Sequence, residues 1–391
     1  MLAVSYKSMI SQKSLFSLPD NVSYLNCAYM GPQLKSVEAV GIESVKRKAL
    51  PFEISPEDFF TQVTELKKAY ARIINIEDHE RIAIVPSASY GINNAANNID
   101  LQSGQNIILA GEQFPSNYYP WEKLADSKKG ELRIINAPQE NVNRGQLWNQ
   151  RILESIDYKT AVVALGHVHW ADGTQFDLQK IRERTNEVGA ALVIDGSQSV
   201  GALPLDVSVL QPDALVNVGY KWLLGPYGMA MAYYGPRFDN GQPIEENWIN
   251  RLNSEDFKNL VNYQSAYKPK ANRYMVGENS QFIHAPMQTK ALNQILDWGI
   301  NNINQYCKDL TEEPVAKLRA MGCFIEDEEN RAHHLLGIRT NGLFNIESLK
   351  SKLEEKSVFV SFRGDAIRVS TNVFNEAKDF EKLISCFESL S

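Results

Sequence analysis

Seven short apolar runs, separated by segments of helix length, constrain the fold of this chain more than any other feature. They lie between residues 81 and 235 and are rich in Val, Ile, Leu and Ala. Several are apolar on both faces, which is typical of strands buried on both sides in a parallel sheet covered by helices. In such sheets, ligands bind beyond the carboxyl ends of the strands. The expected strands are RIAIVPS, NIILAGE, ELRIINA, AVVALGHV, ALVIDGS, ALVNVGY and MAMAYYG.

The alternation of apolar runs and helix-length segments stops after residue 234. The next 45 or so residues are polar and irregular, and they contain scattered aromatic side chains. We expect a structured excursion there, because exposing Trp248 and its aromatic neighbours as a free linker is unfavourable. Helical spacing then returns on a single face. The residues of that face are Leu292, Ile295, Leu296, Gly299 and Ile303.

A second, smaller α/β unit follows. Its expected elements are the strands HHLLGIRT, VFVSFRG and AIRVST, a helix near residues 346–356, and a closing helix with one apolar stripe. The 391 residues, 43% of them hydrophobic, suffice for two packed units. The predicted division is a large domain of residues 20–284 and a small domain of residues 1–19 and 285–391.

Composition excludes several classes of protein. The net charge of -7, without a cluster of Lys and Arg among aromatic residues, argues against a nucleic-acid partner. No apolar run is long enough to span a membrane, and Lys7 and Lys13 interrupt any signal core, so we expect a cytoplasmic protein. The four cysteines are far apart and form no CxxC pair, which argues against a zinc ribbon or a disulfide framework.

Lys221 stands where the run ALVNVGY ends. Burial there lowers the pKa of a lysine ammonium, and a neutral amine is a nucleophile suited to a Schiff base with an aldehyde such as pyridoxal 5'-phosphate (PLP). The structural alternative is a lysine that extends along the sheet edge to water. Upstream, Asp195 ends another strand and can face the pyridine nitrogen, while Gln198 can donate to the phenolate oxygen. Asp195 is equally placed to be a helix N-cap.

Two further strand ends carry candidate cofactor contacts. The segment VPSASYG offers the backbone amides of Ala88 and Ser89 at a helix N-terminus, which suits a phosphate, although a serine N-cap explains it as well. Phe114 follows another strand and can stack on a pyridine ring, or belong to the core.

A rival hypothesis is a metal-dependent hydrolase. One residue separates His167 from His169, so on a strand the two share a face; Asp195 is the third candidate ligand and His284 an optional fourth. This hypothesis leaves Lys221 and the phosphate turn unexplained. We therefore favour the PLP hypothesis and expect no metal.

From YLNCAYMGP to IRVSTNVFN, the chain resembles the class V aminotransferase family of fold-type I PLP enzymes, which includes cysteine desulfurases, selenocysteine lyases, kynureninases and isopenicillin N epimerase-like proteins. The motifs are DGSQSV, GYKWLLGPYG, SASYGINN, EQFPSN and HVHWADG. The resemblance implies a large domain with a mainly parallel seven-stranded sheet between helices and a smaller C-terminal α/β domain. It implies a Schiff base on Lys221 and cofactor contacts from Ala88, Ser89, Phe114, His169, Asp195, Gln198 and Tyr220.

The resemblance also implies how the substrate is held. VSFRGDAIRVS is similar to the family's terminal R-x-S strand, so Arg368 receives the α-carboxylate of an amino acid, and Arg363 either assists or faces solvent. RYMVGENS is similar to a segment that crosses the dimer interface to the partner's cofactor phosphate. Glu278 replaces the usual threonine there, which leaves Asn279 or Ser280 as the donor. The resemblance thus implies a homodimer with active sites at the interface.

One departure bears on the reaction. Desulfurases carry a catalytic cysteine just before the R-x-S strand, and SVFVSFRGDAIRVS has none. We therefore expect an aminotransferase, with a lyase (carbon–sulfur, carbon–selenium or kynureninase-like) or an epimerase as alternatives, and a catalytically silent binding protein as a third class. Tyr29, Trp248 and Arg251 are candidate substrate-pocket residues, and each has a structural role as its alternative.

Overall fold

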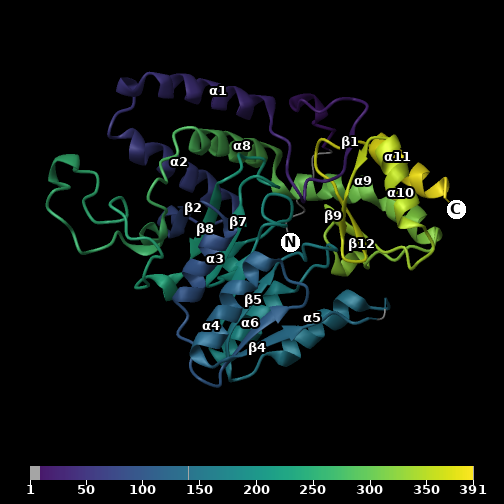
Figure 1. The fold of residues 1–391 in the computed structure, drawn as a ribbon, viewed down its shortest axis with the longest axis horizontal. Coiled ribbons are helices and arrows are strands. Elements are labelled where there is room, and N and C mark those ends of the chain that lie inside the picture. The colour runs from purple at the N-terminus through teal and green to yellow at the C-terminus, as the bar shows by residue number, and fades with distance from the viewer. Residues whose placement is uncertain (1–8, 140, 391) are drawn as a thin grey trace, which may run out of the picture.

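The computed structural model describes residues 9–139 and 141–390, and its centre is a seven-stranded sheet (Figure 1). The strand order is β2-β8-β7-β6-β5-β3-β4; β8 runs antiparallel to β2 and β7, and the other neighbouring pairs are parallel. The expected mainly parallel sheet is confirmed, and each of the seven apolar runs contains one strand. The strands are β2 (Ile82–Val85), β3 (Asn106–Ala110), β4 (Glu131–Ile135), β5 (Thr160–Gly166), β6 (Ala191–Asp195), β7 (Ala214–Val218) and β8 (Ala230–Tyr234).

Helices cover this sheet and share its core. Every residue of β2, β3, β6 and β8 is buried, as expected for strands packed on both faces, whereas the edge strand β4 is partly exposed. The helices are α1 (Lys35–Ala49), α2 (Asp58–Ile73), α3 (Ala88–Asn97), α4 (Tyr119–Lys128), α5 (Arg144–Ser155), α6 (Leu178–Val188), α7 (Val207–Leu210) and α8 (His284–Trp298).

The C-terminal region forms a second core around an antiparallel sheet of order β11-β12-β9 (yellow in Figure 1). Its strands are β9 (Leu335–Ile338), β10 (Val358–Phe359), β11 (Ser361–Arg363) and β12 (Ala366–Ser370), and its helices are α9 (Ile300–Ala320), α10 (Ile346–Glu355) and α11 (Ala377–Glu388).

The N-terminal segment joins this second unit. Strand β1 (Ser23–Tyr24) pairs in parallel with β10, and Leu25 packs in the second core. The domain boundary at residue 20 stays a prediction. Residues 1–8, which the prediction assigns to the small domain, lie outside the described part of the chain. These contacts show that the chain beyond residue 20 still packs against the C-terminal sheet.

The single helical face predicted from Leu292 to Ile303 is wrong in one respect. Gly299 has φ +79°, where it ends α8 and precedes α9, so the face is divided between two helices. Glycine adopts this left-handed region without the steric cost that a Cβ brings, which explains the break. Leu292, Ile295 and Ile303 are nevertheless buried in one core.

The excursion after β8 projects from the body of the molecule as a long irregular segment (teal to green in Figure 1). Short 3-10 helices occur in this segment and elsewhere in the chain. They are η1 (Lys13–Leu15), η2 (Pro51–Glu53), η3 (His79–Arg81), η4 (Pro115–Asn117), η5 (Pro236–Phe238), η6 (Phe257–Asn259), η7 (Lys270–Tyr274) and η8 (Glu328–Asn330). Within the described residues, no helix has both the length and the apolar character needed to cross a bilayer.

Candidate active site

A cavity of about 240 Å³ lies where β5, β6 and β7 end, at the sheet edge that the strand pattern predicts. We call it the Lys221 cavity. Parallel pairing puts Gly166 opposite Asp195, and Asp195 opposite Val216, so residues that follow these strands meet at one edge. The polar and aromatic side chains that line it include Ser89, Phe114, Asp195, Gln198, Tyr220 and Lys221.

Lys221 is only 8% exposed, and its Nζ lies 5.6 Å from the ring centroid of Phe114 and 5.8 Å from that of Tyr220. Burial lowers the pKa of its ammonium to about 8; Asp195 opposes this change and Arg368 adds to it. The alternative of a lysine that reaches water is therefore wrong. A substantial fraction of Lys221 is neutral near physiological pH, which is what a nucleophile or a base requires.

Hydrogen bonds within the chain hold the side chains of Asp195 and Gln198 in place. The Asp195 Oδ1 accepts the Ser197 backbone N–H at 2.9 Å, and the Gln198 Oε1 accepts the Trp222 indole N–H at 2.9 Å. Because an indole only donates, this contact sets the orientation of the amide, and Gln198 Nε2 donates to the Ala28 carbonyl at 3.0 Å. One N–H of this amide remains for a ligand oxygen.

The N-terminal end of α3 supplies backbone donors. The Ser87 Oγ accepts the Tyr90 N–H at 3.2 Å and lies 2.9 Å from the Ser89 Oγ. The N–H groups of Ala88 and Ser89 belong to the first turn of α3 and so have no carbonyl acceptor within the helix, and both residues line the cavity. The turn that Ser87 caps therefore also presents N–H groups that suit an anion.

The segment NCAYMGP closes another side of the site. Gly31 donates its N–H to the Tyr220 carbonyl at 2.9 Å, and a Cβ on Gly31 would lie 2.2 Å from the Lys221 carbonyl oxygen. Only glycine allows this approach. The close packing fixes the backbone that carries Lys221.

An adjoining cavity of about 430 Å³ shares Lys221, Phe114 and Trp170 with the first and adds Arg363 and Arg368. We call it the arginine cavity. Arg368 on β12 is 2% exposed; its Nη1 donates to the Trp170 carbonyl at 2.9 Å, and its buried Nε has no partner among the described residues. Burial, with Arg363 nearby, lowers its pKa to about 10. An uncompensated buried guanidinium is costly, so it marks a position for an anionic ligand.

His169 is not among the residues that line either cavity. Its Nδ1 lies 3.1 Å from the Asp172 Oδ1, and its ring packs edge-on against Trp148 with centroids 5.0 Å apart. The strand face that His167 and His169 were expected to share is therefore wrong, while the cofactor contact of His169 stays a prediction. The reason is that β5 ends at Gly166, so strand alternation does not extend to this residue, and Trp170 lines both cavities instead.

Ser280 also lies outside both cavities. Its hydroxyl donates to the Phe59 carbonyl at 2.8 Å, and Asn279 donates to the Val276 carbonyl at 2.8 Å, whereas Glu278 is exposed. The expected contact of Ser280 concerns a partner subunit and stays a prediction.

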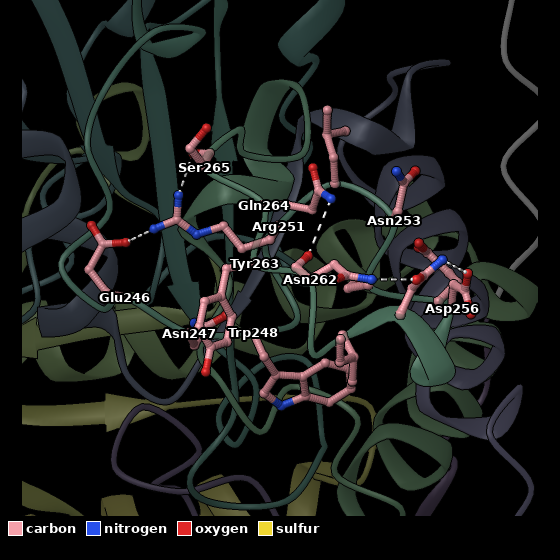
Figure 2. A pocket seen from close by; sticks show the side chains of 15 residues that line it. Glu246, Asn247, Trp248, Arg251, Asn253, Asp256, Asn262, Tyr263, Gln264 and Ser265 are labelled. Carbon is pink, nitrogen blue, oxygen red and sulfur yellow. Dashed lines mark hydrogen bonds and ion pairs between the residues drawn. The ribbon is translucent and has the colours of Figure 1, made fainter.

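Two of the three candidate substrate residues lie elsewhere. Tyr29 lines the arginine cavity, but Trp248 and Arg251 line a separate open hollow of about 1010 Å³ formed by residues 246–265 of the excursion. We call it the loop hollow. Figure 2 shows Arg251 bonded to Glu246 on one side and to the Ser265 carbonyl on the other.

Sequence reasoning missed several residues of the site. Ser197 and Gln113 line the Lys221 cavity, and the Ser197 Oγ and Gln113 Nε2 are buried without partners in the described part of the chain. Tyr227 lines both cavities and stacks obliquely on Tyr220, with centroids 4.5 Å apart. Ser197 and Tyr227 belong to the motifs DGSQSV and GYKWLLGPYG, so their proximity in sequence to Asp195 and Lys221 was a usable signal.

The metal hypothesis finds no support in the arrangement of its residues. The described residues contain no group of three or more His, Cys, Asp or Glu side chains placed to hold a metal. Burial, together with His334, lowers the pKa of His167 to about 4, and the His284 Nδ1 lies against Gln281 at 3.1 Å.

The four cysteines are all described, and all are buried as free thiols outside the two cavities. Burial raises the pKa of Cys27 to about 12 and that of Cys323 to about 11, and it raises those of Cys307 and Cys386 as well. These thiols are poor nucleophiles, in agreement with the expected absence of a desulfurase cysteine.

The donor set of the Lys221 cavity fits PLP. Lys221 supplies an amine for the aldehyde, Asp195 a carboxylate for the pyridine nitrogen, and Gln198 an amide N–H for the phenolate oxygen. The N–H groups of Ala88 and Ser89 suit the phosphate, and Phe114 borders the same space. The unpartnered Ser197 Oγ and Gln113 Nε2 also match a polar ligand.

Comparisons with known proteins agree with this geometry. The aminotransferase class-V family model matches residues 55–378. An uncharacterized aminotransferase of Schizosaccharomyces pombe is 23% identical over 95% of this chain and 92% of its own length, and a cysteine desulfurase of Shigella sonnei is 31% identical over 44% of this chain and 42% of its own.

Solved structures share the fold. The cystine C-S lyase C-DES, in complex with its reaction product cysteine persulfide, has a TM-score of 0.82 at 18% identity, over 95% of this chain and 98% of that one. The cysteine desulfurase CsdA of Escherichia coli has a TM-score of 0.80 at 17% identity, over 97% of this chain and 98% of that one. The family match, the shared fold and the donor set together lead to one conclusion: this chain belongs to the class V aminotransferase family, with pyridoxal 5'-phosphate as its cofactor.

Proposed function

We propose that this enzyme acts on an α-amino acid and transfers its amino group. The observation that carries the proposal is that two buried cations, Lys221 and Arg368, line the same arginine cavity. Lys221, with a lowered pKa, borders both cavities, and Arg368 borders the arginine cavity without a carboxylate partner among the described residues. An amino-acid carboxylate on Arg368 would bring Cα toward the amine of Lys221.

Each of these residues has a definable task. The bound cofactor supplies an aldehyde for the substrate amine and an electron sink for the bond that breaks at Cα. Lys221 removes the Cα proton and returns one, because its pKa of about 8 lies close to the operating range of a general base. Asp195 keeps a proton on the pyridine nitrogen by its negative charge. Arg368 orients the substrate with its planar pair of donors.

Transamination is favoured over the alternatives for two reasons. Two relatives, whose matches cover 95% and 81% of this chain, are named uncharacterized aminotransferases. None of the four cysteines, all of which are described, lines either cavity, so the thiol of a desulfurase is lacking. A carbon–sulfur lyase is the second candidate, supported by the structural similarity to C-DES; kynureninase-like and epimerase reactions remain as further alternatives.

The test is a survey of single amino acids with the purified holoenzyme. The visible absorbance of the bound cofactor and the released products are followed together. An aminotransferase converts the cofactor to pyridoxamine 5'-phosphate and releases an equivalent of 2-oxo acid. Ammonia with pyruvate, and no pyridoxamine 5'-phosphate, would identify a lyase instead.

We also propose a homodimer. In the segment of residues 273–280, Glu278 is exposed whereas the side chains of Asn279 and Ser280 are bonded within the chain. We expect Glu278 and the backbone around it to be what a partner subunit meets. Light scattering on the purified protein should give twice the 44.1 kDa chain mass, and the chain mass alone would refute the dimer.

A further inference from the structure

Two arginines share one face of the β11–β12 hairpin. The antiparallel register pairs Ser361 with Arg368 and Arg363 with Ala366. Because side chains alternate along a strand, all four lie on the same face, and Arg363 and Arg368 are diagonal neighbours. Both line the arginine cavity.

Neither guanidinium forms an ion pair within residues 9–139 and 141–390. The one hydrogen bond of the Arg363 side chain in this region goes to the adjacent Phe362 carbonyl, at 2.7 Å. The carboxylate in the hairpin turn, Asp365, is held by the Arg339 Nε at 3.0 Å. Asp172 is likewise held, by Arg144 at 3.0 Å and Arg339 at 2.8 Å. Asp365 and Asp172 are thus committed elsewhere.

Trp170 connects the two arginines. Its ring centroid lies 5.8 Å from the Arg363 guanidinium carbon and 6.0 Å from that of Arg368. Its carbonyl takes one donor of Arg368, which leaves other N–H groups of both side chains for a ligand. Among the described residues that line the two cavities, Asp195 is the single carboxylate, and it serves the cofactor nitrogen.

A single α-carboxylate bound by Arg368 therefore leaves Arg363 without an anionic partner. We propose that the substrate is an amino acid with a second carboxylate in its side chain, bound by Arg363 while Arg368 binds the α-carboxylate. This assignment rests on the proposed function, because it uses Arg368 as the α-carboxylate site. Arg363 is then the residue that selects an acidic substrate over a neutral one.

The test compares unreactive dicarboxylates with monocarboxylates of equal length. Binding of succinate, glutarate, butyrate and valerate to the holoenzyme is measured by calorimetry, with wild type, Arg363→Gln, Arg368→Gln and, as a matched control, Arg251→Gln from the loop hollow. A charge-assisted hydrogen bond contributes roughly 10-fold or more to affinity. We expect the better dicarboxylate to bind wild type at least ~10-fold more tightly than its monocarboxylate.

Each variant has a distinct expected effect. Arg363→Gln should abolish the preference for the dicarboxylate and leave the monocarboxylate unchanged, Arg368→Gln should weaken both, and Arg251→Gln should change neither. The cofactor absorbance of each variant confirms that the site is folded. The same preference should separate aspartate or glutamate from alanine in the reaction of the holoenzyme.

Two failures are distinguishable. If neutral and acidic amino acids react equally, and Arg363→Gln leaves the ratio of affinities unchanged, the second carboxylate site is refuted while the proposed function stands. If no amino acid of either kind alters the cofactor absorbance, the proposed function falls and this inference falls with it.

Discussion

The Lys221 cavity and the loop hollow differ in how their charged side chains are paired, and their sizes do not reveal this difference. The hollow is about four times larger, at about 1010 Å³ against about 240 Å³, yet its one lining cation is paired: Arg251 bonds to Glu246, and Glu255 of the lining bonds to Lys268 beside it. Around the Lys221 cavity and the adjoining arginine cavity, Lys221 and Arg368 are buried cations with lowered pKa values. Unpaired buried charge, and not volume, distinguishes the functional site.

The physical reason is the difference in cost. An exposed ion pair contributes little to stability and persists anywhere on a surface, whereas an unpaired buried cation weakens the fold unless a ligand compensates it. Tyr263 at the hollow is 96% exposed, while Arg368 is 2% exposed. Substitutions in the two regions should therefore act on different quantities.

The largest effect is expected for Lys221→Ala. Loss of the base should lower kcat/KM by ~10²–10⁴-fold, and borohydride should no longer trap the cofactor on residue 221. Peptide mapping after reduction gives the second readout. Because removal of a desolvated ammonium relieves a cost, the variant should remain folded.

The control for this change is Arg251→Ala in the loop hollow, which should alter kcat/KM less than about twofold, as expected for a surface residue away from special features. A labelled lysine at another position in the Lys221→Ala protein would contradict the assignment. Equal losses in the two variants would remove the distinction between the regions.

Asp172 sharpens the comparison, because it is buried yet paired. Burial alone raises the pKa of this carboxyl, but His169, Arg144 and Arg339 hold it well below its ordinary value. Asp172→Ala should lower the free energy of unfolding by about 3–5 kcal/mol, since it leaves buried arginines without a partner. Denaturant unfolding of the apoenzyme measures this. A loss below about 1 kcal/mol would show that the cluster behaves like a surface pair.

Sequence alone predicted the parts of the site that follow strand ends. Asp195 and Lys221 directly follow buried apolar runs, so the sheet edge that gathers them could be inferred from the alternation. The same logic failed for His169, because the strand ended three residues earlier and a turn stabilised by Asp172 redirected its ring. Local pattern does not reveal where a strand stops.

The arginine cavity shows a second limit. Arg368 was assigned by resemblance, but its contact with the Trp170 carbonyl joins residues 198 positions apart and depends on how the C-terminal sheet packs against the large one. The pairing of Arg363 with Arg368 on one face depends on the hairpin register, which no periodicity in VSFRGDAIRVS specifies. Long-range packing of this kind had to come from the structure.

Arg368→Gln is expected to have the next effect, on binding and on pH dependence. Loss of a charge-assisted contact should raise KM for the amino acid by roughly 10-fold or more while the cofactor stays bound. Arg368 helps to lower the pKa of Lys221, so its removal should raise that pKa above about 8. Cofactor uptake by the apoenzyme needs the neutral amine, so its rate should rise with pH through about 8 in wild type and at higher pH in the variant.

Stopped-flow absorbance across pH checks this sign. An uptake profile that moves to lower pH, or an unchanged KM, would contradict the placement of Arg368 beside Lys221. Arg251→Gln again serves as the control and should leave both quantities unchanged.

The smallest effect is expected for the pair formed by Glu246 and Arg251 in the loop hollow. Their side chains are 59% and 24% exposed, so water screens the attraction, and a double-mutant cycle should give a coupling of at most about 1 kcal/mol in the free energy of unfolding. The coupling should shrink further at high salt, because ions screen exposed charges. A coupling that stays large in salt, or a fall in kcat/KM for either single variant, would break the comparison. It would mean that the hollow is covered in the assembled enzyme and contributes to an active site after all.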